Sequence, residues 1–302
     1  MAKAIRGVVV TGANKGIGLA IVERLLAERE DTHVFLGSRS VARGQEARAG
    51  LLARNPAWES RVAVLQLDVD DEASVQAATR DVAAQVGTLY GLVNNAGIVD
   101  GTPEKIIATN VVSVKRVSDA FMPLLQTPGG RIVNLSSGVA PNFVGPCSPE
   151  RQRFFVNKTV SWAQIQAVTE EFLTAANSPG EALAAAGFPR ADSGLLLSAY
   201  GFSKACLNSL TMFQAASRPD LIINACTPGF IATDLTREMV GRRGGTPEAA
   251  GALSVEKGTI STWRLLFGDL PAGMTGKYFG SDGLRSPMDK YRKPTDPEYT
   301  GE

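Results

Sequence analysis

A tyrosine and a lysine stand four residues apart in the segment Ser198–Asn208 of this 302-residue chain. On a helix, Tyr200 and Lys204 would share one face, one turn apart. Tyrosine is a poor acid at neutral pH, but a nearby lysine cation favours the phenolate and lowers the tyrosine pKa toward the range of a proton donor. Taken alone, the pair is more simply explained as part of an ordinary amphipathic helix. The rest of the chain decides between these two explanations.

The start of the chain has a pattern typical of phosphate binding. A short β-branched run, Gly7–Thr11, predicts a buried strand, and apolar residues at helical spacing predict a helix from about Ile17 to Glu28. The turn between them carries Gly12, Gly16 and Gly18. Glycines let the backbone approach a pyrophosphate, and free N–H groups at the start of the helix face its charge. We therefore favour cofactor binding over a plain tight turn.

The next predicted strand, Thr32–Leu36, indicates which dinucleotide is bound. The end of this strand meets the adenine ribose in dinucleotide-binding folds, and an acidic residue there accepts a hydrogen bond from the 2′-hydroxyl. Here the position carries Arg39, no Asp or Glu occurs from Val34 to Ala42, and Lys15 supplies a second cation. A guanidinium plus a lysine suits a phosphate dianion, so the sequence favours NADP(H) over NAD. The alternative is that both are solvated surface cations.

Strand and helix patterns then alternate along the chain. This spacing predicts right-handed crossovers and a doubly wound (Rossmann) parallel sheet, an α/β fold. The further strands are predicted at Arg61–Leu67, Leu89–Val93, Arg131–Leu135, Leu221–Ala225 and Lys277–Phe279, and the further helices at Val41–Arg54, Glu72–Val86, Glu104–Leu125 and roughly Thr246–Phe267.

Small and polar residues follow several of these strands. Asn94-Asn95-Ala96-Gly97 follows the fourth strand, Ser136 and Ser137 follow the fifth, and the run Thr227–Asp234 follows the strand Leu221–Ala225. Ligands of doubly wound sheets bind at the carboxyl ends of the strands. We therefore expect these residues to gather at one ligand-binding edge.

One stretch interrupts the alternation. From Ala140 to Leu197 no strand pattern appears, and a helical segment is predicted near Val160–Ala176. The residues from Arg285 onward are charged and contain prolines, which predicts a loose tail. The chain is thus expected to form a single domain, residues 1–302, with a helical insertion at about 146–197 before the Tyr200 helix and a tail at about 285–302.

Composition excludes several classes of function. The formal net charge is only +1, so the overall charge does not favour binding to nucleic acid or to an anionic membrane surface. No apolar run approaches the roughly 20 residues of a membrane span. The apolar run among the first residues is too short for a signal sequence. Cys147, Cys206 and Cys226 form no spaced pattern, and the only histidine, His33, lies in a predicted strand. We expect a cytoplasmic protein with no metal site.

Taken in order, these motifs resemble the short-chain dehydrogenase/reductase family over nearly the whole chain. The long segment between Ser137 and Tyr200 is similar to that of the monomeric carbonyl reductases and the plant menthone and salutaridine reductases. Shorter matches are Asn14–Val22, Arg43-Gly44-Gln45 and Cys147–Glu150. The main matching motifs are Thr11-Gly12-x-x-x-Gly16-Ile17-Gly18, Asn94-Asn95-Ala96-Gly97, Asn110, Ser137, Tyr200-x-x-x-Lys204 and Pro228-Gly229.

The resemblance implies a role for each matching residue. Tyr200 would donate a proton to the carbonyl oxygen, and Lys204 would lower the tyrosine pKa and hold the nicotinamide ribose. Ser137 would orient the carbonyl, and Asn110 would keep a water in place for proton relay. The residues implied to bind the cofactor are Gly12, Asn14, Lys15, Gly16, Ile17, Gly18, Arg39, Asp68, Val69, Asn95, Ala96, Gly97, Tyr200, Lys204, Pro228, Gly229, Ile231 and Thr233.

The implied activity is NADPH-dependent reduction of a ketone, aldehyde or quinone, with a small carbonyl compound as substrate. The alternatives are an NADP-linked steroid or terpenoid alcohol dehydrogenase and a catalytically idle NADP-binding regulator. The connection from Gly97 to Asn110 looks shorter than in animal carbonyl reductases and the insertion looks longer, so substrate identity is not implied. Phe143, Trp162 and Phe230 could be pocket walls, although ordinary packing is the simpler interpretation. An insertion that packs over the Tyr200 helix would cover the face used for dimerisation, which predicts a monomer.

Overall fold

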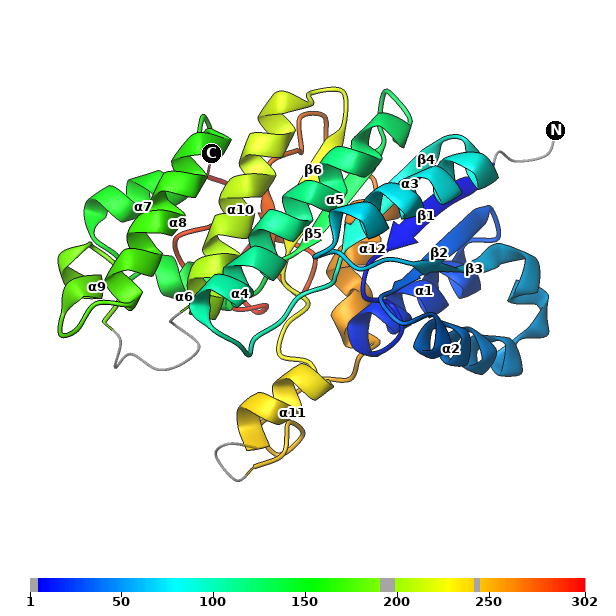
Figure 1. Ribbon diagram of the computed structural model, residues 1–302, viewed down its shortest axis with the longest axis horizontal. Helices are drawn as coiled ribbons and strands as arrows, with labels where there is room; N and C mark the ends of the chain where they lie inside the picture. The colour runs from blue at the N-terminus through cyan, green and yellow to red at the C-terminus, as the bar shows by residue number, and fades with distance from the viewer. Residues whose placement is uncertain (1–4, 191–198, 242–244, 302) are drawn as a thin grey trace.

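The structure, a computed structural model, describes residues 5–190, 199–241 and 245–301. It contains one eight-stranded sheet in the order β3-β2-β1-β4-β5-β6-β7-β8 (Figure 1). Strands β1 to β7 pair in parallel, and β8 pairs antiparallel to β7. The strands are β1 Arg6–Val10, β2 Thr32–Ser38, β3 Val62–Gln66, β4 Leu89–Asn94, β5 Arg131–Leu135, β6 Ile222–Cys226, β7 Tyr278–Phe279 and β8 Arg285–Ser286.

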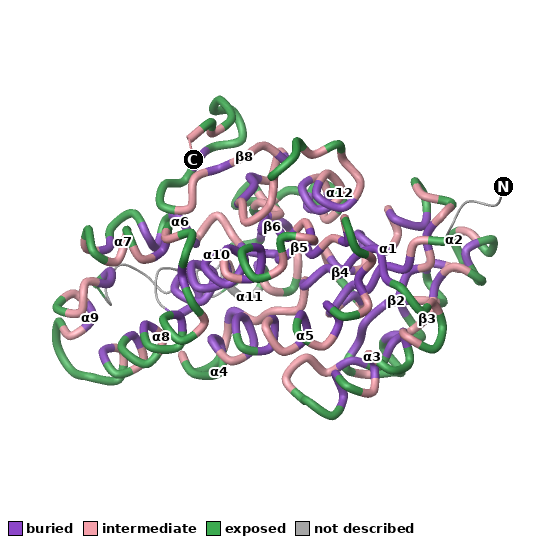
Figure 2. Tube along the Cα trace, turned by 90° about the horizontal axis from the view of Figure 1, so that it is seen from above, coloured by how far each residue is buried: buried purple, intermediate pink, exposed green. Residues whose placement is uncertain are grey.

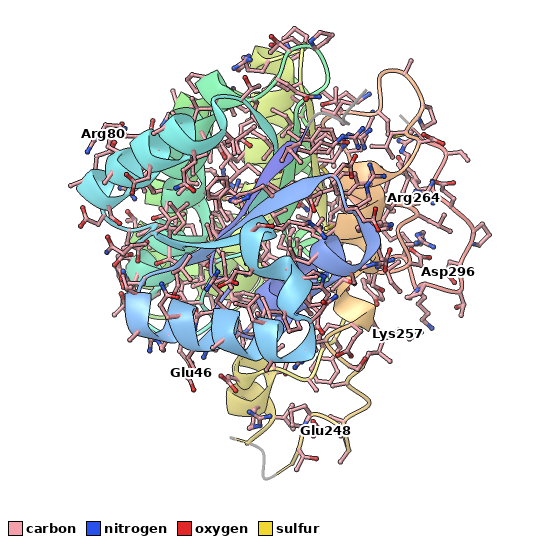
Figure 3. The ribbon with its side chains drawn as sticks, turned by 90° about the vertical axis from the view of Figure 1, so that its right-hand side faces the viewer. Glu46, Arg80, Glu248, Lys257, Arg264 and Asp296 are labelled. Atoms are coloured by element: carbon pink, nitrogen blue, oxygen red, sulfur yellow. The ribbon has the colours of Figure 1, made fainter. Side chains whose placement is uncertain are left out.

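Helices cover both faces of this sheet. Val8 and Val10 of β1 pack in one apolar cluster with α1 (Gly16–Glu28), α2 (Val41–Arg54) and α12 (Ile260–Phe267). Val9 packs in the opposite cluster with α3 (Glu72–Val86) and α5 (Ser113–Phe121). Because successive residues of a strand point to opposite faces, this apolar β1 is buried on both sides, and the predicted doubly wound α/β fold is confirmed. Charged side chains such as Glu46 and Arg80 are exposed on the outer faces of α2 and α3 (Figure 3).

Two predicted helices differ from the structure. The helix expected at Glu104–Leu125 is divided into α4 (Pro103–Ile107), the π-helical turn η2 (Ala108–Val112), α5 and the 3₁₀ turn η3 (Met122–Leu124). The prediction of a helix over the first half of Thr246–Phe267 was wrong. Leu253 forms an isolated parallel bridge with Ile231, and Gly251 has a positive φ of 83°, so the chain turns there. Helical structure resumes only at η6 (Lys257–Thr259) and α12.

The long segment before the Tyr200 helix is helical where it is described. It forms α6 (Val139–Val144), α7 (Pro149–Phe155), α8 (Trp162–Ala176) and α9 (Ala182–Ala185). Helices α6, α7 and α8 pack on α10 (Ala199–Ser217), and α9 packs on α8. Helix α10 carries Tyr200 and is buried along most of its length (Figure 2). Positions 191–197 of the expected insertion and Ser198 lie outside the described residues.

An aromatic cluster joins the insertion to α10. Phe143 has no exposed surface and contacts Phe155, Phe172 and Phe202 edge-on. Phe172 of α8 stacks on Phe202 of α10 with ring centroids 3.9 Å apart. Phe143 is therefore a packing residue, as the simpler interpretation held. Trp162 also packs against this cluster and lies beneath the ammonium of Lys115.

The end of the chain is more ordered than the sequence suggested. Strand β8 extends the sheet, and Arg292 is 8% exposed. The Arg292 guanidinium pairs with Asp282 and donates to the carbonyl oxygen of Asp296 at 2.7 Å. The expectation of a loose tail from Arg285 does not hold for this part, because one buried cation ties it to the loop after β7.

Three further observations concern the membrane spans, metal sites and cysteines considered from composition. None of the described helices is both long and apolar enough to cross a membrane. Among residues 5–190, 199–241 and 245–301, no group of His, Cys, Asp and Glu side chains could hold a metal ion. Cys147, Cys206 and Cys226 are free and buried.

Candidate active site

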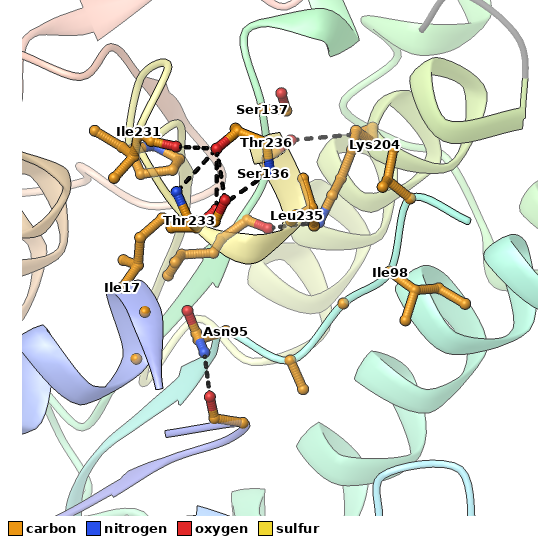
Figure 4. A pocket seen from close by; sticks show the side chains of 18 of the residues that line it. Ile17, Asn95, Ile98, Ser136, Ser137, Lys204, Ile231, Thr233, Leu235 and Thr236 are labelled. Atoms are coloured by element: carbon orange, nitrogen blue, oxygen red, sulfur yellow. Dashed lines mark hydrogen bonds between the residues drawn. The ribbon is translucent and has the colours of Figure 1, made fainter. Parts of the chain in front are cut away.

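A cavity of about 930 Å³ opens at the carboxyl ends of β1, β4, β5 and β6 (Figure 4). The turn after β1, the Asn94–Gly97 segment after β4 and the serines after β5 all reach it. Every residue named from the sequence as catalytic or cofactor-binding lines this cavity, with the single exception of Asn110. Phe230 lines it too and is 37% exposed, whereas Phe143 and Trp162 do not line it.

The glycine turn is held in shape by its neighbours on β4. Gly12 and Gly16 have positive φ angles of 60° and 56°, which side-chain-bearing residues rarely adopt. A Cβ added to Gly18 would lie 2.5 Å from the side-chain nitrogen of Asn95. Asn95 Nδ2 donates to the carbonyl oxygens of Thr11 and Gly12 at 2.8 and 3.1 Å. Asn95 therefore shapes the turn through its side chain.

The start of α1 lines the cavity. Its N-cap residue, Lys15, makes no side-chain capping hydrogen bond, and its first turn has no acidic residue, so no side chain of the helix itself occupies the N–H groups there. Lys15 itself pairs with Asp234, its ammonium 2.7 Å from a carboxylate oxygen. This contact with Lys15 holds the pKa of Asp234 below its usual range. Lys15 is thus paired with Asp234 and also lines the cavity, so its role as a second phosphate-facing cation stays a prediction.

A second guanidinium accompanies Arg39 at the cavity. Arg39 and Arg43 are both exposed and both line the cavity. Arg43 lies in the first turn of α2, four residues after Arg39, where Ser40 caps the helix by accepting a hydrogen bond from the Arg43 backbone N–H. The sequence reasoning missed Arg43 as a site residue. The signal that could have indicated it was its position four residues after Arg39, at the start of a predicted helix.

Tyr200 and Lys204 share one face of α10, as their spacing predicted. The Lys204 ammonium lies 5.7 Å from the Tyr200 ring centroid and donates to the carbonyl oxygen of Leu135 at 2.9 Å. Burial lowers the pKa of Lys204 to about 8. Burial also raises the pKa of Tyr200, and a hydrogen bond with Ser137 partly opposes that rise. The expected lowering of the tyrosine pKa by Lys204 is not found, because burial dominates both groups.

The two serines after β5 have different contacts. Ser137 bonds to Tyr200 through its side chain, and its carbonyl oxygen accepts a hydrogen bond from the Tyr278 hydroxyl at 3.0 Å. Ser136 donates to the backbone carbonyl of Lys204 at 3.3 Å and so joins β5 to α10. The geometry therefore places Ser137, rather than Ser136, beside the tyrosine hydroxyl.

Comparison with known proteins identifies the family of this chain. The family model for short chain dehydrogenases matches residues 6–147. "Carbonyl reductase [NADPH] 1" from Macaca fascicularis is 34% identical over an alignment of 252 residues, which covers 78% of this chain and 85% of that protein. The chain belongs to the short-chain dehydrogenase family.

Two solved structures of the family are similar in fold. Menthone neomenthol reductase from Mentha piperita has a TM-score of 0.73 at 26% identity and covers 92% of this chain and 99% of its own. Salutaridine reductase from Papaver somniferum has a TM-score of 0.74 at 26% identity and covers 90% of this chain and 99% of its own. The resemblance stated from the motifs, including its subgroup, is confirmed.

Asn110 occupies a special backbone position in this short-chain dehydrogenase. It lies in the π-helical turn η2, a type of irregularity that is frequent at functional sites. Its side chain accepts a hydrogen bond from Ile98 N–H at 2.9 Å and donates to Ile98 O at 2.8 Å and Ser203 Oγ at 3.0 Å. Asn110 has no exposed surface. It therefore joins the segment after β4 to α10 from behind the cavity wall.

Two threonines that the sequence motifs included, without a role for their hydroxyls, hold the site together. Thr11 Oγ1 accepts from the N–H groups of Asn95 and Ala96 at 3.0 and 2.9 Å, which ties β1 to β4. Thr227 Oγ1 accepts from Gly138 and Gly229 at 3.0 and 3.1 Å, which ties the serine loop to the Pro228-Gly229 loop. A threonine directly after a strand and before a glycine turn was the available signal in the first case.

Proposed function

We propose that this protein reduces a ketone, aldehyde or quinone carbonyl to the alcohol with NADPH, and that Tyr200 donates the proton. The observation that carries this proposal is that Ser137, Tyr200 and Lys204 come together in one cavity, whose lining also includes the glycine turn and two guanidiniums. The name of the relative "Carbonyl reductase [NADPH] 1" supports the same activity.

The residues present fit a dinucleotide. A side chain at Gly18 would collide with Asn95 and the Gly12 carbonyl. No side chain therefore covers the backbone of the turn at this position, where a pyrophosphate would approach. Arg39 and Arg43 suit the 2′-phosphate of NADP(H), since planar guanidiniums bind phosphate in a bidentate way. We assign the adenine end to Asp68 and Val69, and the nicotinamide end to Lys204, Ile231 and Thr233. When bound, the reduced nicotinamide supplies a hydride to the carbonyl carbon.

The protein's own residues handle the oxygen and its proton. Because the pKa of Tyr200 is raised by burial, its hydroxyl is protonated at neutral pH and can donate. Ser137 orients the carbonyl oxygen toward Tyr200 and stabilises the charge that develops on it. As the proton leaves Tyr200, the resulting phenolate is stabilised by the Lys204 ammonium, which is charged below a pH of about 8. Asn110 supports this arrangement by fixing Ile98 and α10.

We further propose that the protein is a monomer. Helices α6, α7 and α8 pack on α10, and Phe202 of α10 is enclosed by Phe143, Phe155 and Phe172 of the insertion. A helix covered in this way has no bare face to offer a second subunit. Burying one such aromatic side chain contributes roughly 1.5–3 kcal/mol, so the covered arrangement is stable without a partner.

The test is NADPH oxidation measured against a panel of ketones, aldehydes and quinones, with the matching alcohols and NADP⁺ as the reverse assay. Tyr200→Phe should bind NADPH like the wild type while turnover falls about 10²- to 10⁴-fold. Tyr299→Phe serves as the matched control, because Tyr299 lies outside the cavity against Arg285. A Tyr200→Phe enzyme that keeps a third of its activity, or a wild type that oxidises NADPH with no member of the panel, would contradict the proposal.

A further inference from the structure

The cavity is lined in part by residues from the end of the chain. Tyr278, Ser286, Tyr291 and Arg292 reach it from beyond β6. Of the large apolar side chains that are exposed, Phe230 and Tyr291 are the aromatic ones, and both line this cavity. Tyr291 is 43% exposed. An exposed aromatic ring inside a cavity offers apolar area to a ligand.

Tyr291 lies directly beside the serine loop. A Cβ added to Gly138 would be 2.9 Å from Cε2 of the Tyr291 ring, so the ring packs on the backbone next to Ser137. Tyr278, whose hydroxyl donates to the carbonyl oxygen of Ser137 at 3.0 Å, lines the same part of the cavity. The Tyr291 ring is therefore adjacent to the residues proposed to hold the carbonyl group.

The position of Tyr291 is fixed by its neighbour in sequence. Arg292 Nη2 lies 2.5 Å from Asp282 Oδ1, and Arg292 Nε donates to Ser286 Oγ at 3.0 Å. A Cβ at Gly280 would lie 2.6 Å from Arg292 Nη2, so the glycine makes the room that the guanidinium occupies. On the other side of Tyr291, Met288 packs against the cluster that contains Phe143 and Tyr200.

We infer that the segment Ser286–Arg292 forms a wall of the substrate site and that Tyr291 is a specificity-determining residue which packs against a planar ring beside the reacting carbonyl. This inference rests on the proposed function for the position of the carbonyl, but ring binding can be measured without turnover. Arg292 is a positioning residue, because its hydrogen bonds are all used to hold the segment.

The test compares two ketones that differ in one respect. Acetophenone carries a planar ring beside its carbonyl, and cyclohexyl methyl ketone carries a saturated ring of similar size. Their affinities for the protein saturated with NADP⁺ are measured by calorimetry for the wild type and for Tyr291→Ala, Tyr291→Leu and Tyr291→Phe. The control is Tyr299→Ala, another tail tyrosine, which lies against Arg285 and not in the cavity.

We expect Tyr291→Ala and Tyr291→Leu to weaken acetophenone binding about three- to tenfold, the value of one aromatic contact. Binding of the saturated ketone should change less than twofold with Leu, and Tyr291→Phe and Tyr299→Ala should match the wild type. The affinity for NADP⁺ should stay constant throughout. Equal losses for both ketones, unchanged binding in Tyr291→Ala and Tyr291→Leu, or a wild type that binds neither ketone would each overturn the inference. A wild type that binds acetophenone but never reduces a carbonyl would refute the proposed function alone.

Discussion

Replacing Lys204 by methionine should abolish activity and yet stabilise the protein at pH 7. Lys204 is 5% exposed, and burial lowers its pKa from 10.5 to about 8. At about 1.36 kcal/mol for each pH unit of difference, this corresponds to roughly 3–4 kcal/mol against folding when the ammonium is charged. Methionine removes that cost, but it leaves the carbonyl oxygen of Leu135 without its donor, which costs about 1–3 kcal/mol. We therefore expect a net gain of about 1–2 kcal/mol in the free energy of unfolding.

The sign of this effect depends on pH. Below about pH 8 the lysine is protonated in both the folded and the unfolded chain, so the wild type carries the full cost of the buried charge. Between about pH 8 and 10.5 the folded state releases its proton first, and the wild type becomes more stable as the pH rises. The advantage of Lys204→Met should shrink across this range, and by pH 10 the variant should be the less stable protein.

The assay is urea unfolding followed by circular dichroism at pH 7 and pH 10, with NADPH oxidation measured in parallel. Midpoints are compared only where the slopes agree, since a changed slope signals a changed unfolded state. Lys257→Met is the matched control, because Lys257 is exposed. A Lys204→Met protein that is less stable than the wild type at pH 7 would refute the reasoning, because it would show that the buried ammonium stabilises the fold.

Two further predictions concern the cofactor and the assembly. Arg39→Asp should weaken NADPH binding about ten- to a hundredfold, the value of one charge-assisted phosphate contact, with a smaller effect on NADH; equal affinities of the wild type for NADP⁺ and NAD⁺ in titration would contradict this assignment. The protein should sediment as a single species of 31.9 kDa at micromolar concentration, because α10 is covered by α6, α7 and α8; a dimer or tetramer would refute the covering argument and leave the chemistry untouched.

Most of the sheet was predictable from the sequence because its signals are local. The β-branched runs of β1, β2 and β5 and the apolar spacing of α2 and α3 fixed these elements to within two residues. The glycine turn and the residues after β4 and β5 follow from the rule that ligands bind at the carboxyl ends of parallel strands. That edge is where the cavity lies.

The features that were missed depend on contacts between distant segments. Asp70 accepts hydrogen bonds from Lys105, Thr109 and Ser113, which flank the π-helical turn at Asn110. No local sequence pattern predicts a π-helical turn, so the sequence analysis predicted one uninterrupted helix. The Arg292–Asp282 ion pair could not be predicted from a local pattern either. It anchors a segment that the sequence, with its charges and prolines, suggested to be a loose tail. The pairing of Lys15 with Asp234 joins residues 219 positions apart.

The pKa of Tyr200 shows how the insertion and the chemistry are linked. The sequence suggested that Lys204 would set this pKa, but burial has the larger effect. Tyr200 belongs to the same apolar cluster as the insertion helices. Phe202, two residues from both Tyr200 and Lys204 and so on the opposite face of α10, stacks on Phe172 of α8 at 3.9 Å. This contact fixes the rotation of α10 about its own axis. The insertion can thus cover the surface of α10 and at the same time hold the tyrosine and the lysine toward the cavity. A change that loosened Phe172 would be expected to lower turnover before it altered cofactor binding, because the glycine turn and Arg39 lie on other elements.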